Sequence, residues 1–333
     1  MKKAWLFLLA CTYLAGCAFA QPSPVASPAD TPLPPTDTPL LLINTPAPRF
    51  THLYAFGDSY SDNGNGFSIA VKEMVAEGEL DAEFQKWFET YYWEGRISNG
   101  PTAVEVLANQ LNVGLTDYAV GGAKSDVSNN IDWNALQNTG ILKQVEKFKS
   151  DFNGENADPE ALYFIHISIN DFLALLDKNP SHDKESTINQ ADRSVENIIK
   201  VVTQLVDSGA RQFMIVNSID LSKLPVVISD GFVEDAKEFQ SHINSRLPGE
   251  MQKLAQLPHV RITIFDPMTV SDEIWSNPNE YGFTDLTDYC MVADDTSTEV
   301  CESPDQYYFW DDIHPTRVVH QIMGEAMAEQ LSK

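Results

Sequence analysis

The sequence predicts an α/β protein, a three-layer α/β/α sandwich built on a mainly parallel sheet. Short runs rich in β-branched and aromatic residues alternate with longer segments whose apolar residues recur with the helical period. Clusters of Gly, Asp, Ser and Asn directly follow several of the short runs. This alternation indicates parallel strands whose connecting helices cover both faces of the sheet, and ligands then bind at the carboxyl ends of the strands.

Five strands and five longer helices are expected in the folded part of the chain. The strands are expected at 52–56, 115–120, 161–168, 212–217 and 260–265, and the helices at 101–111, 140–152, 191–208, 233–256 and 316–331. The first of these helices is a clear case, because Pro101 stands at its start and Glu105 in its first turn. Val104, Leu107 and Leu111 then share one apolar face.

The first residues have the features of a secretory signal. Lys2 and Lys3 precede an apolar stretch at 4–14, which is too short to span a bilayer, and small residues follow it. Cleavage before Gln21 would make residues 1–20 the signal peptide. We therefore expect a secreted, extracellular protein.

A second processing site overlaps the first. Residues 14–17 resemble a bacterial lipobox, which would end the signal at residue 16 and leave an outer-membrane lipoprotein acylated on Cys17. Residues 21–50 are dense in Pro and Thr, so we expect a linker there, and residues 51–333 are expected to form a single domain.

The composition is acidic. Lys and Arg number 22 and Asp and Glu 48, which gives a net charge of −26 at pH 7. No nucleic-acid partner is expected, because phosphate backbones are bound by clustered Lys and Arg. The same charge opposes contact with anionic membrane surfaces and favours a substrate whose head group is zwitterionic or neutral.

Cys290 and Cys301 are the two cysteines of the folded part. In an oxidising compartment they are expected to form a disulfide that closes a surface loop, and two free thiols are the alternative. No metal site is expected, because the sequence has no HExxH motif and no second cysteine pair in this part.

Four segments carry residue types suited to catalysis. Ser59 follows a buried strand and Gly57, so its hydroxyl can stand at the edge of the sheet as a nucleophile, with a plain turn as the alternative. Gly121 and Gly122 follow another strand, where glycine lets backbone N–H groups approach a ligand oxygen.

The other two segments supply polar side chains. Asn170 follows a third strand, and its amide can donate to a developing oxyanion. Asp311 and His314 lie in a loop before the last helix, where the carboxylate can orient one imidazole nitrogen while the other faces a nucleophile. Taken singly, each of these segments is also compatible with a turn or a helix cap.

Together the segments resemble a known family. FGDSYSDNGN, ISNGPTAVEVLA, DYAVGGA, SIND and WDDIHPT, in this order, resemble the GDSL subgroup of the SGNH hydrolases, whose fold is flavodoxin-like. The resemblance spans residues 51–331 and implies that Ser59 is the nucleophile, His314 the general base and Asp311 its orienting acid. The implied oxyanion hole consists of the Ser59 backbone N–H, the Gly122 backbone N–H, with Gly121 as the alternative, and the Asn170 side chain.

Two residues depart from the family pattern. Tyr60 replaces the usual Leu of the GDSL tetrapeptide, and Ser168 replaces the Gly that usually stands two residues before the oxyanion Asn. A larger residue at position 168 is expected to disturb the loop that aims Asn170. The linker, residues 99–108 and the late cysteine loop are most similar to the bacterial lysophospholipase and glycerophospholipid:cholesterol acyltransferase group.

The resemblance implies acyl transfer through an acyl-enzyme, without a cofactor. The expected substrates are lysophospholipids or phospholipids, with cholesterol as an alternative acyl acceptor, and the expected enzyme is a monomer with peripheral membrane contact. A carbohydrate-ester deacetylase of the same fold and a non-catalytic envelope lipoprotein that binds lipid are the alternatives. An assay of Ser59→Ala separates the enzyme from the binding protein.

Two surrounding segments are expected to shape access to the site. Aromatic residues between the Ser59 segment and residue 99 either line an acyl-chain groove or form a helix packed on the core; they are Phe84, Trp87, Phe88, Tyr91, Tyr92 and Trp93. The loop between Cys290 and Cys301 is expected either to cover the site or to be a solvated acidic loop.

Overall fold

The computed structural model describes residues 50–78, 81–153, 156–176, 183–294 and 296–333, which belong to one compact unit. The expected signal peptide, both processing sites and nearly all of the linker lie outside the described residues. Within the described ranges, no helix has both the length and the apolar character that crossing a bilayer requires.

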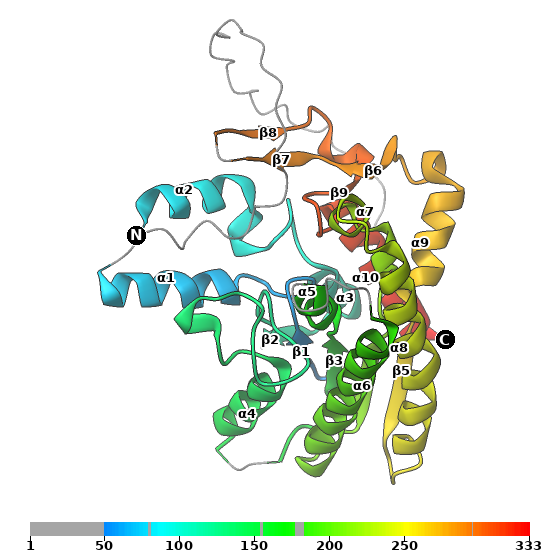
Figure 1. Cartoon of the computed structure of the whole chain (residues 1–333). Coiled ribbons are helices and arrows are strands. Elements are labelled where there is room, and N and C mark those ends of the chain that lie inside the picture. Colours follow the sequence, from blue (N-terminus) through cyan, green and yellow to red (C-terminus); the bar gives the residue numbers. More distant parts are fainter. Residues whose placement is uncertain (1–49, 79–80, 154–155, 177–182, 295) are drawn as a thin grey trace, which may run out of the picture. The chain divides into compact units, whose positions relative to one another are not determined.

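Five parallel strands form the central sheet, in the order β2-β1-β3-β4-β5 (Figure 1). They are β1 (His52–Gly57), β2 (Gly114–Asp117), β3 (Leu162–His166), β4 (Gln212–Val216) and β5 (Arg261–Phe265). Because β1 lies between β2 and β3, the strand order reverses beside it, and open parallel sheets bind ligands at such a point. All five strands coincide with expected strands, although the second ends three residues early.

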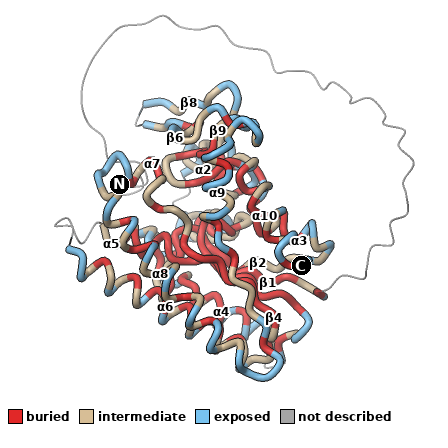
Figure 2. The backbone as a smooth tube through the Cα atoms, turned by 90° about the vertical axis from the view of Figure 1, so that its right-hand side faces the viewer, coloured by how far each residue is buried: buried red, intermediate tan, exposed pale blue. Residues whose placement is uncertain are grey.

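Helices cover both faces of the sheet, which confirms the predicted three-layer class. α4 (Ile141–Asp151), α6 (Lys184–Asp207) and α8 (Val233–Leu254) pack along one face, and α3 (Ala103–Leu111) and α10 (Arg317–Ser332) pack on the other (Figure 2). Every residue of β3 and β4 is buried between these layers. The near-continuous apolar runs of these strands follow from burial on both faces.

Several elements were not expected from the sequence. The helices are α1 (Asn65–Glu77), α5 (Ile169–Leu176), α7 (Pro225–Ser229) and α9 (Pro267–Ser276), and the short strands are β6 (Asp285–Tyr289), β7 (Met291–Ala293), β8 (Thr298–Val300) and β9 (Tyr307–Phe309). A helix was one of the two alternatives for the aromatic segment, and it forms as α2 (Ala82–Tyr91). The helix expected from residue 191 also begins earlier, at Lys184, because the Asp183 carboxylate caps its first turn by accepting from the N–H groups of Glu185 and Ser186.

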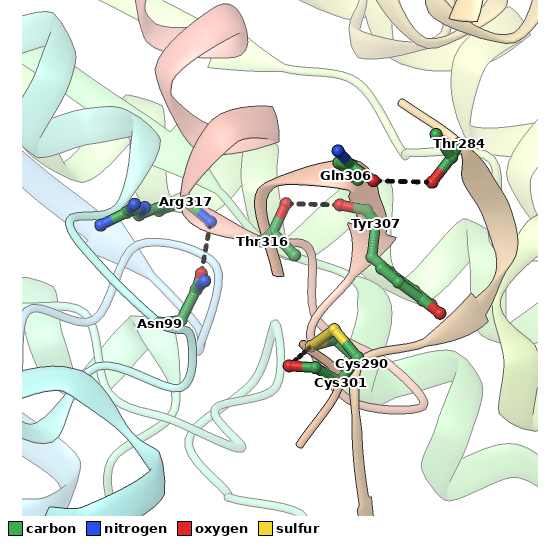
Figure 3. Close-up of a disulfide and its surroundings, with 8 residues drawn as sticks. All are labelled: Asn99, Thr284, Cys290, Cys301, Gln306, Tyr307, Thr316 and Arg317. Carbon is green, nitrogen blue, oxygen red and sulfur yellow. Dashed lines mark hydrogen bonds between the residues drawn. A yellow bond between two sulfur atoms is a disulfide. The ribbon is translucent and has the colours of Figure 1, made fainter. Parts of the chain in front are cut away.

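A second, smaller core lies apart from that of the sheet. β7 and β8 pair as an antiparallel hairpin that the Cys290–Cys301 disulfide closes (Figure 3). Tyr92, Cys290, Met291 and Trp310 form a buried cluster of their own, here called the hairpin cluster. Half-buried aromatic residues of α2 pack against it, so α2 and the hairpin stabilise one another.

Candidate active site

The backbone that leads to Ser59 is fixed from two sides. Gly57 ends β1 so close to β3 that a Cβ there would lie 2.4 Å from the His166 carbonyl oxygen. The side-chain amide of Gln144, on α4, accepts from the Gly57 N–H at 2.9 Å and donates to its carbonyl at 2.8 Å. Ser59 is therefore placed at the carboxyl end of β1 by residues of β3 and α4.

Residues 310–316, here called the base loop, connect β9 to α10. The Trp310 N–H donates to the His314 carbonyl at 2.7 Å. Figure 3 shows the Thr316 hydroxyl, which donates to the Tyr307 carbonyl at 2.8 Å. At the start of α10, the Arg317 N–H donates to the Asn99 side chain at 2.7 Å. The Asn-Gly-Pro segment near residue 100 thus anchors the end of the base loop.

Tyr60, which departs from the family pattern, also holds the base loop. Its hydroxyl donates to the Ile313 carbonyl at 2.6 Å, and its ring lies 5.6 Å from that of His314. The usual Leu has no hydroxyl to make this bond. Tyr60 therefore joins the segment of Ser59 directly to the loop that carries His314.

The structure brings Ser59, His314 and Asp311 together in one line. His314 Nε2 lies 2.8 Å from Ser59 Oγ, across 255 positions of sequence, and His314 Nδ1 lies 2.9 Å from both carboxylate oxygens of Asp311. Because a carboxylate only accepts, Nδ1 carries the imidazole proton and Nε2 is free to accept the proton of Ser59. Such contacts are those that a nucleophile, a base and an orienting acid require.

Burial and charge act in opposite directions on this pair. Burial lowers the pKa of His314, but the charge of Asp311 and the hydrogen bond to it outweigh burial, so the pKa lies above the ordinary value of 6.5. Burial likewise raises the pKa of Asp311, and the charge of His314 with the accepted hydrogen bonds brings it below 3.8. The His314 imidazole is consequently paired with a carboxylate that stays ionised.

This pKa predicts the pH dependence of activity. A general base must be unprotonated, so kcat/KM for a soluble ester should fall as the pH drops through the pKa of His314, with a midpoint above about 6.5. A pH–rate profile of p-nitrophenyl butyrate hydrolysis measures this midpoint. Enzyme that is preincubated at each pH and then assayed at neutral pH shows whether the loss of activity comes from unfolding instead. An acidic limb well below pH 6.5 would contradict the prediction.

Two backbone N–H groups at the site, those of Ser59 and Gly122, are candidate donors to a ligand. In the described part of the chain, neither the Ser59 N–H nor the Gly122 N–H has a hydrogen-bond partner. The Gly121 N–H, by contrast, donates to Asp62 Oδ2 at 2.6 Å. Gly122 has φ +77°, and a Cβ there would lie 2.3 Å from Asn129 Oδ1. This geometry favours Gly122 over Gly121 as the donor.

Asn170 lies in the first turn of α5 rather than in a loop. Its Nδ2 donates one proton to the Ala123 carbonyl at 3.1 Å, which leaves the second N–H for a ligand and ties Asn170 to the Gly122 segment. Ser168 has φ +143°, a conformation that favours glycine, so the usual family residue would be unstrained there. With Ser168 in this conformation, the Asn170 amide still donates to the Ala123 carbonyl.

Relief of this strain should stabilise the protein. We expect Ser168→Gly to raise the free energy of unfolding by about 1 kcal/mol, because the strained backbone costs more than the added chain entropy of glycine. Urea denaturation followed by circular dichroism measures the change. A loss of stability in this variant would show that the Ser168 side chain contributes more than its backbone costs.

Asp62 is a site residue whose role was missed in the sequence. Its carboxylate accepts from the N–H groups of Gly64, Asn65 and Gly66 at the start of α1, as well as from Gly121. It therefore joins the Ser59 segment to the paired glycines. An Asp just before a Gly-rich helix start is a capping signal that could have indicated part of this role.

Comparison with known proteins identifies the family. The model of the GDSL-like lipase/acylhydrolase family matches residues 53–327. The chain belongs to this family. The resemblance inferred from the five segments is thereby confirmed, and so is the fold class.

Curated relatives include ester-processing enzymes. The phosphatidylcholine-sterol acyltransferase of Aeromonas hydrophila is 24% identical, over 84% of this chain and 90% of that protein. The thermolabile hemolysin of Vibrio parahaemolyticus is 26% identical, over 84% of this chain and 64% of that protein. A solved lipolytic G-D-S-L family protein from Veillonella parvula is 12% identical, covers 85% of this chain and 99% of that one, and has a TM-score of 0.45. Family membership supports esterase, lipase or acyltransferase activity in general.

Proposed function

We propose that the protein is a secreted serine esterase acting on lipid acyl esters, as a lysophospholipase A or phospholipase that can also transfer the acyl group to cholesterol. The observation that carries the proposal is the contact of His314 with both Ser59 Oγ and Asp311, at 2.8 and 2.9 Å. The three side chains are about nine-tenths buried, which strengthens their electrostatic interactions.

The proposed reaction follows from this geometry. His314 Nε2 removes the Ser59 proton while Oγ attacks the ester carbonyl, and the N–H groups of Ser59, Gly122 and Asn170 stabilise the oxyanion. The imidazolium then protonates the leaving alcohol, which leaves an acyl-enzyme on Ser59. Water or a sterol hydroxyl attacks the acyl-enzyme, His314 takes up the proton of this acceptor, and Ser59 is regenerated.

The preference for lipid is supported by aromatic residues beside Asp311. Tyr92, at the end of α2, contacts Asp311, and its ring lies 4.7 Å from that of Phe88 and 5.7 Å from that of Trp87. Phe84 continues this surface one turn earlier and packs edge-on against Trp133 at 5.5 Å. Tyr92 is buried at the site, and the half-buried rings that lead away from it provide an apolar surface suited to an acyl chain.

Shortening this surface should reduce the preference for long chains. We expect Phe84→Ala to raise KM for a long-chain lysophosphatidylcholine roughly tenfold, because contact with several methylenes is lost, while KM for p-nitrophenyl butyrate stays within twofold. Phe152→Ala is the matched control, since Phe152 is also half-buried but packs on Tyr54 and Phe148 of the main core. Equal changes for both esters would contradict an acyl-chain role for Phe84.

A product assay tests the proposed function. Hydrolysis of lysophosphatidylcholine is compared with that of acetylated xylan, and phosphatidylcholine is supplied with and without cholesterol, with Ser59→Ala as the blank. Fatty acid release supports the lipase, cholesteryl ester shows acyl transfer, and acetate release alone would favour the deacetylase. Lipid binding without turnover would favour the non-catalytic lipoprotein.

The proposed extracellular location rests on the sequence signal and on the disulfide, since disulfides persist in oxidising compartments. Mass measurement of the mature protein tests it, because cleavage before Gln21 and acylation of Cys17 give different N-termini. A monomer with peripheral membrane contact remains our expectation.

The disulfide hairpin is proposed to restrict access to the site. The Cys290 N–H donates to the Phe309 carbonyl at 3.1 Å, and the Met291 N–H donates to the Trp310 carbonyl at 2.7 Å, so the hairpin adjoins the start of the base loop. Unchanged turnover after limited proteolysis between Cys290 and Cys301 would count against this gating.

A further inference from the structure

One hydrogen bond to Asp311 comes from a residue outside the five segments that resemble the family. Tyr92 is buried at the end of α2, and its hydroxyl donates to Asp311 Oδ2 at 2.9 Å. The other oxygen, Oδ1, accepts from the N–H groups of Ile313 and His314, at 2.9 and 2.6 Å. Among the described residues, Tyr92 and His314 are the side chains that hydrogen-bond to Asp311.

We propose that Tyr92 is a positioning residue, which fixes the Asp311 carboxylate and through it the His314 imidazole. This inference rests on the proposed serine esterase function. The backbone donors hold only Oδ1. Without the Tyr92 hydroxyl, Oδ2 would accept only from His314, and the carboxylate would be free to rotate. A hydrogen bond to a buried charged group is among the stronger ones in proteins, because water is excluded from it.

Neighbouring elements determine where the Tyr92 hydroxyl lies. The Tyr92 N–H donates to the Phe88 carbonyl at 2.8 Å, and its ring packs in the hairpin cluster with Cys290 and Trp310. The Trp87 indole N–H, one turn earlier, donates to the hydroxyl of Thr298 on β8 at 2.8 Å. The orientation of Asp311 thus depends on α2 and the disulfide hairpin, which lie outside the central sheet.

The charged and titratable groups around His314 come from four elements. Asp311 and Asp312 lie on the base loop, Asp58 and Tyr60 follow β1, His166 ends β3, and His320 lies on α10. Burial raises the pKa of Asp58 and of Asp312 to about 7 and lowers that of His320 to about 3. All of these groups remain in a variant that lacks only the Tyr92 hydroxyl, so a change in its pH profile reports on that hydroxyl.

The variant Tyr92→Phe tests the inference, with Tyr118→Phe as the matched control. Tyr118 is also a buried tyrosine whose hydroxyl donates to an aspartate, Asp151 on α4, at 3.0 Å. With p-nitrophenyl butyrate we expect Tyr92→Phe to lower kcat about tenfold with KM within twofold, and to move the acidic limb upward by roughly half a pH unit. The limb moves upward because the carboxylate, no longer sharing its charge with the hydroxyl, attracts the His314 proton more strongly.

Tyr118→Phe should leave kcat and the acidic limb unchanged. A Tyr92→Phe enzyme with kcat within twofold of the parent, or with an acidic limb that is unmoved or lowered, overturns the inference.

If Tyr92→Phe folds poorly, a second measurement tests the inference on the parent protein. The proton resonance of the His314 Nδ1–H group is followed through a pH titration. A proton on Nδ1 that is held against a fixed carboxylate gives a single, slowly exchanging signal, whereas a rapidly exchanging or absent signal overturns the inference. Ser59→Ala separates failure of the proposed function from failure of the Tyr92 inference. If activity survives this change, Ser59 is not the nucleophile, whatever the result for Tyr92→Phe.

Discussion

Ser59→Ala is expected to abolish ester hydrolysis, with kcat lowered by roughly 10⁴- to 10⁶-fold and the fold intact. The substitution removes the oxygen that would carry the acyl group, and His314 Nε2, 2.8 Å away, then has no hydroxyl proton to accept. Binding and the oxyanion donors remain, so residual catalysis over water is expected. The measurement is fatty acid release from lysophosphatidylcholine together with circular dichroism of the variant.

Ser61→Ala is the matched control for this experiment. Ser61 is also buried, two residues further along, and its hydroxyl has no hydrogen-bond partner in the described part of the chain. Removing an unpaired hydroxyl costs little, so Ser61→Ala should keep the parental kcat. A Ser59→Ala enzyme that retains more than about a hundredth of the parental kcat would contradict the nucleophile assignment.

Asn170→Ala is expected to have the second largest effect, lowering kcat by about 10²- to 10³-fold with little change in KM. The lost N–H would interact with the oxyanion of the tetrahedral intermediate more strongly than with the ground-state carbonyl, so the chemical step suffers and binding does not. Steady-state kinetics on p-nitrophenyl butyrate separate the two constants.

Asn217→Ala provides the control for Asn170. Asn217 is buried directly after β4, as Asn170 is just beyond β3, and its Oδ1 has no partner among the described residues. Its removal should leave kcat unchanged. If Asn170→Ala retains kcat within tenfold while Ser59→Ala is inactive, the oxyanion is held by backbone N–H groups alone, and the role given to Asn170 is wrong.

The central sheet could be predicted because its inner strands are buried, with β3 and β4 buried at every residue, while the edge strands β2 and β5 are half-buried. All five strands were located as short segments rich in β-branched or aromatic residues and bounded by turn residues. α5 was missed because it starts at Ile169, three residues after β3 ends at His166, so the apolar run gives no sign that the conformation changes. α2 was left undecided because its aromatic residues fit both a groove and a packed helix.

The candidate site could be predicted only as far as its motifs extend. Ser59, Asp311 and His314 stand in recognisable segments whose order identifies the family, and the structure brings them together. The choice between Gly121 and Gly122 depends on which N–H the Asp62 carboxylate occupies, a contact across 59 positions. The bond from Tyr92 to Asp311 spans 219 positions and leaves no local pattern, so sequence alone could not reveal it.

The separation of the hairpin cluster from the main core has a consequence for the durability of the enzyme. The cluster comprises few buried side chains, whereas the main core unites all five sheet strands with their helices. Small cores open at lower cost than large ones, and such openings precede global melting. Heating should therefore inactivate the protein at temperatures where the sheet is still intact, and cooling should restore turnover as long as the Cys290–Cys301 bond has kept the hairpin closed.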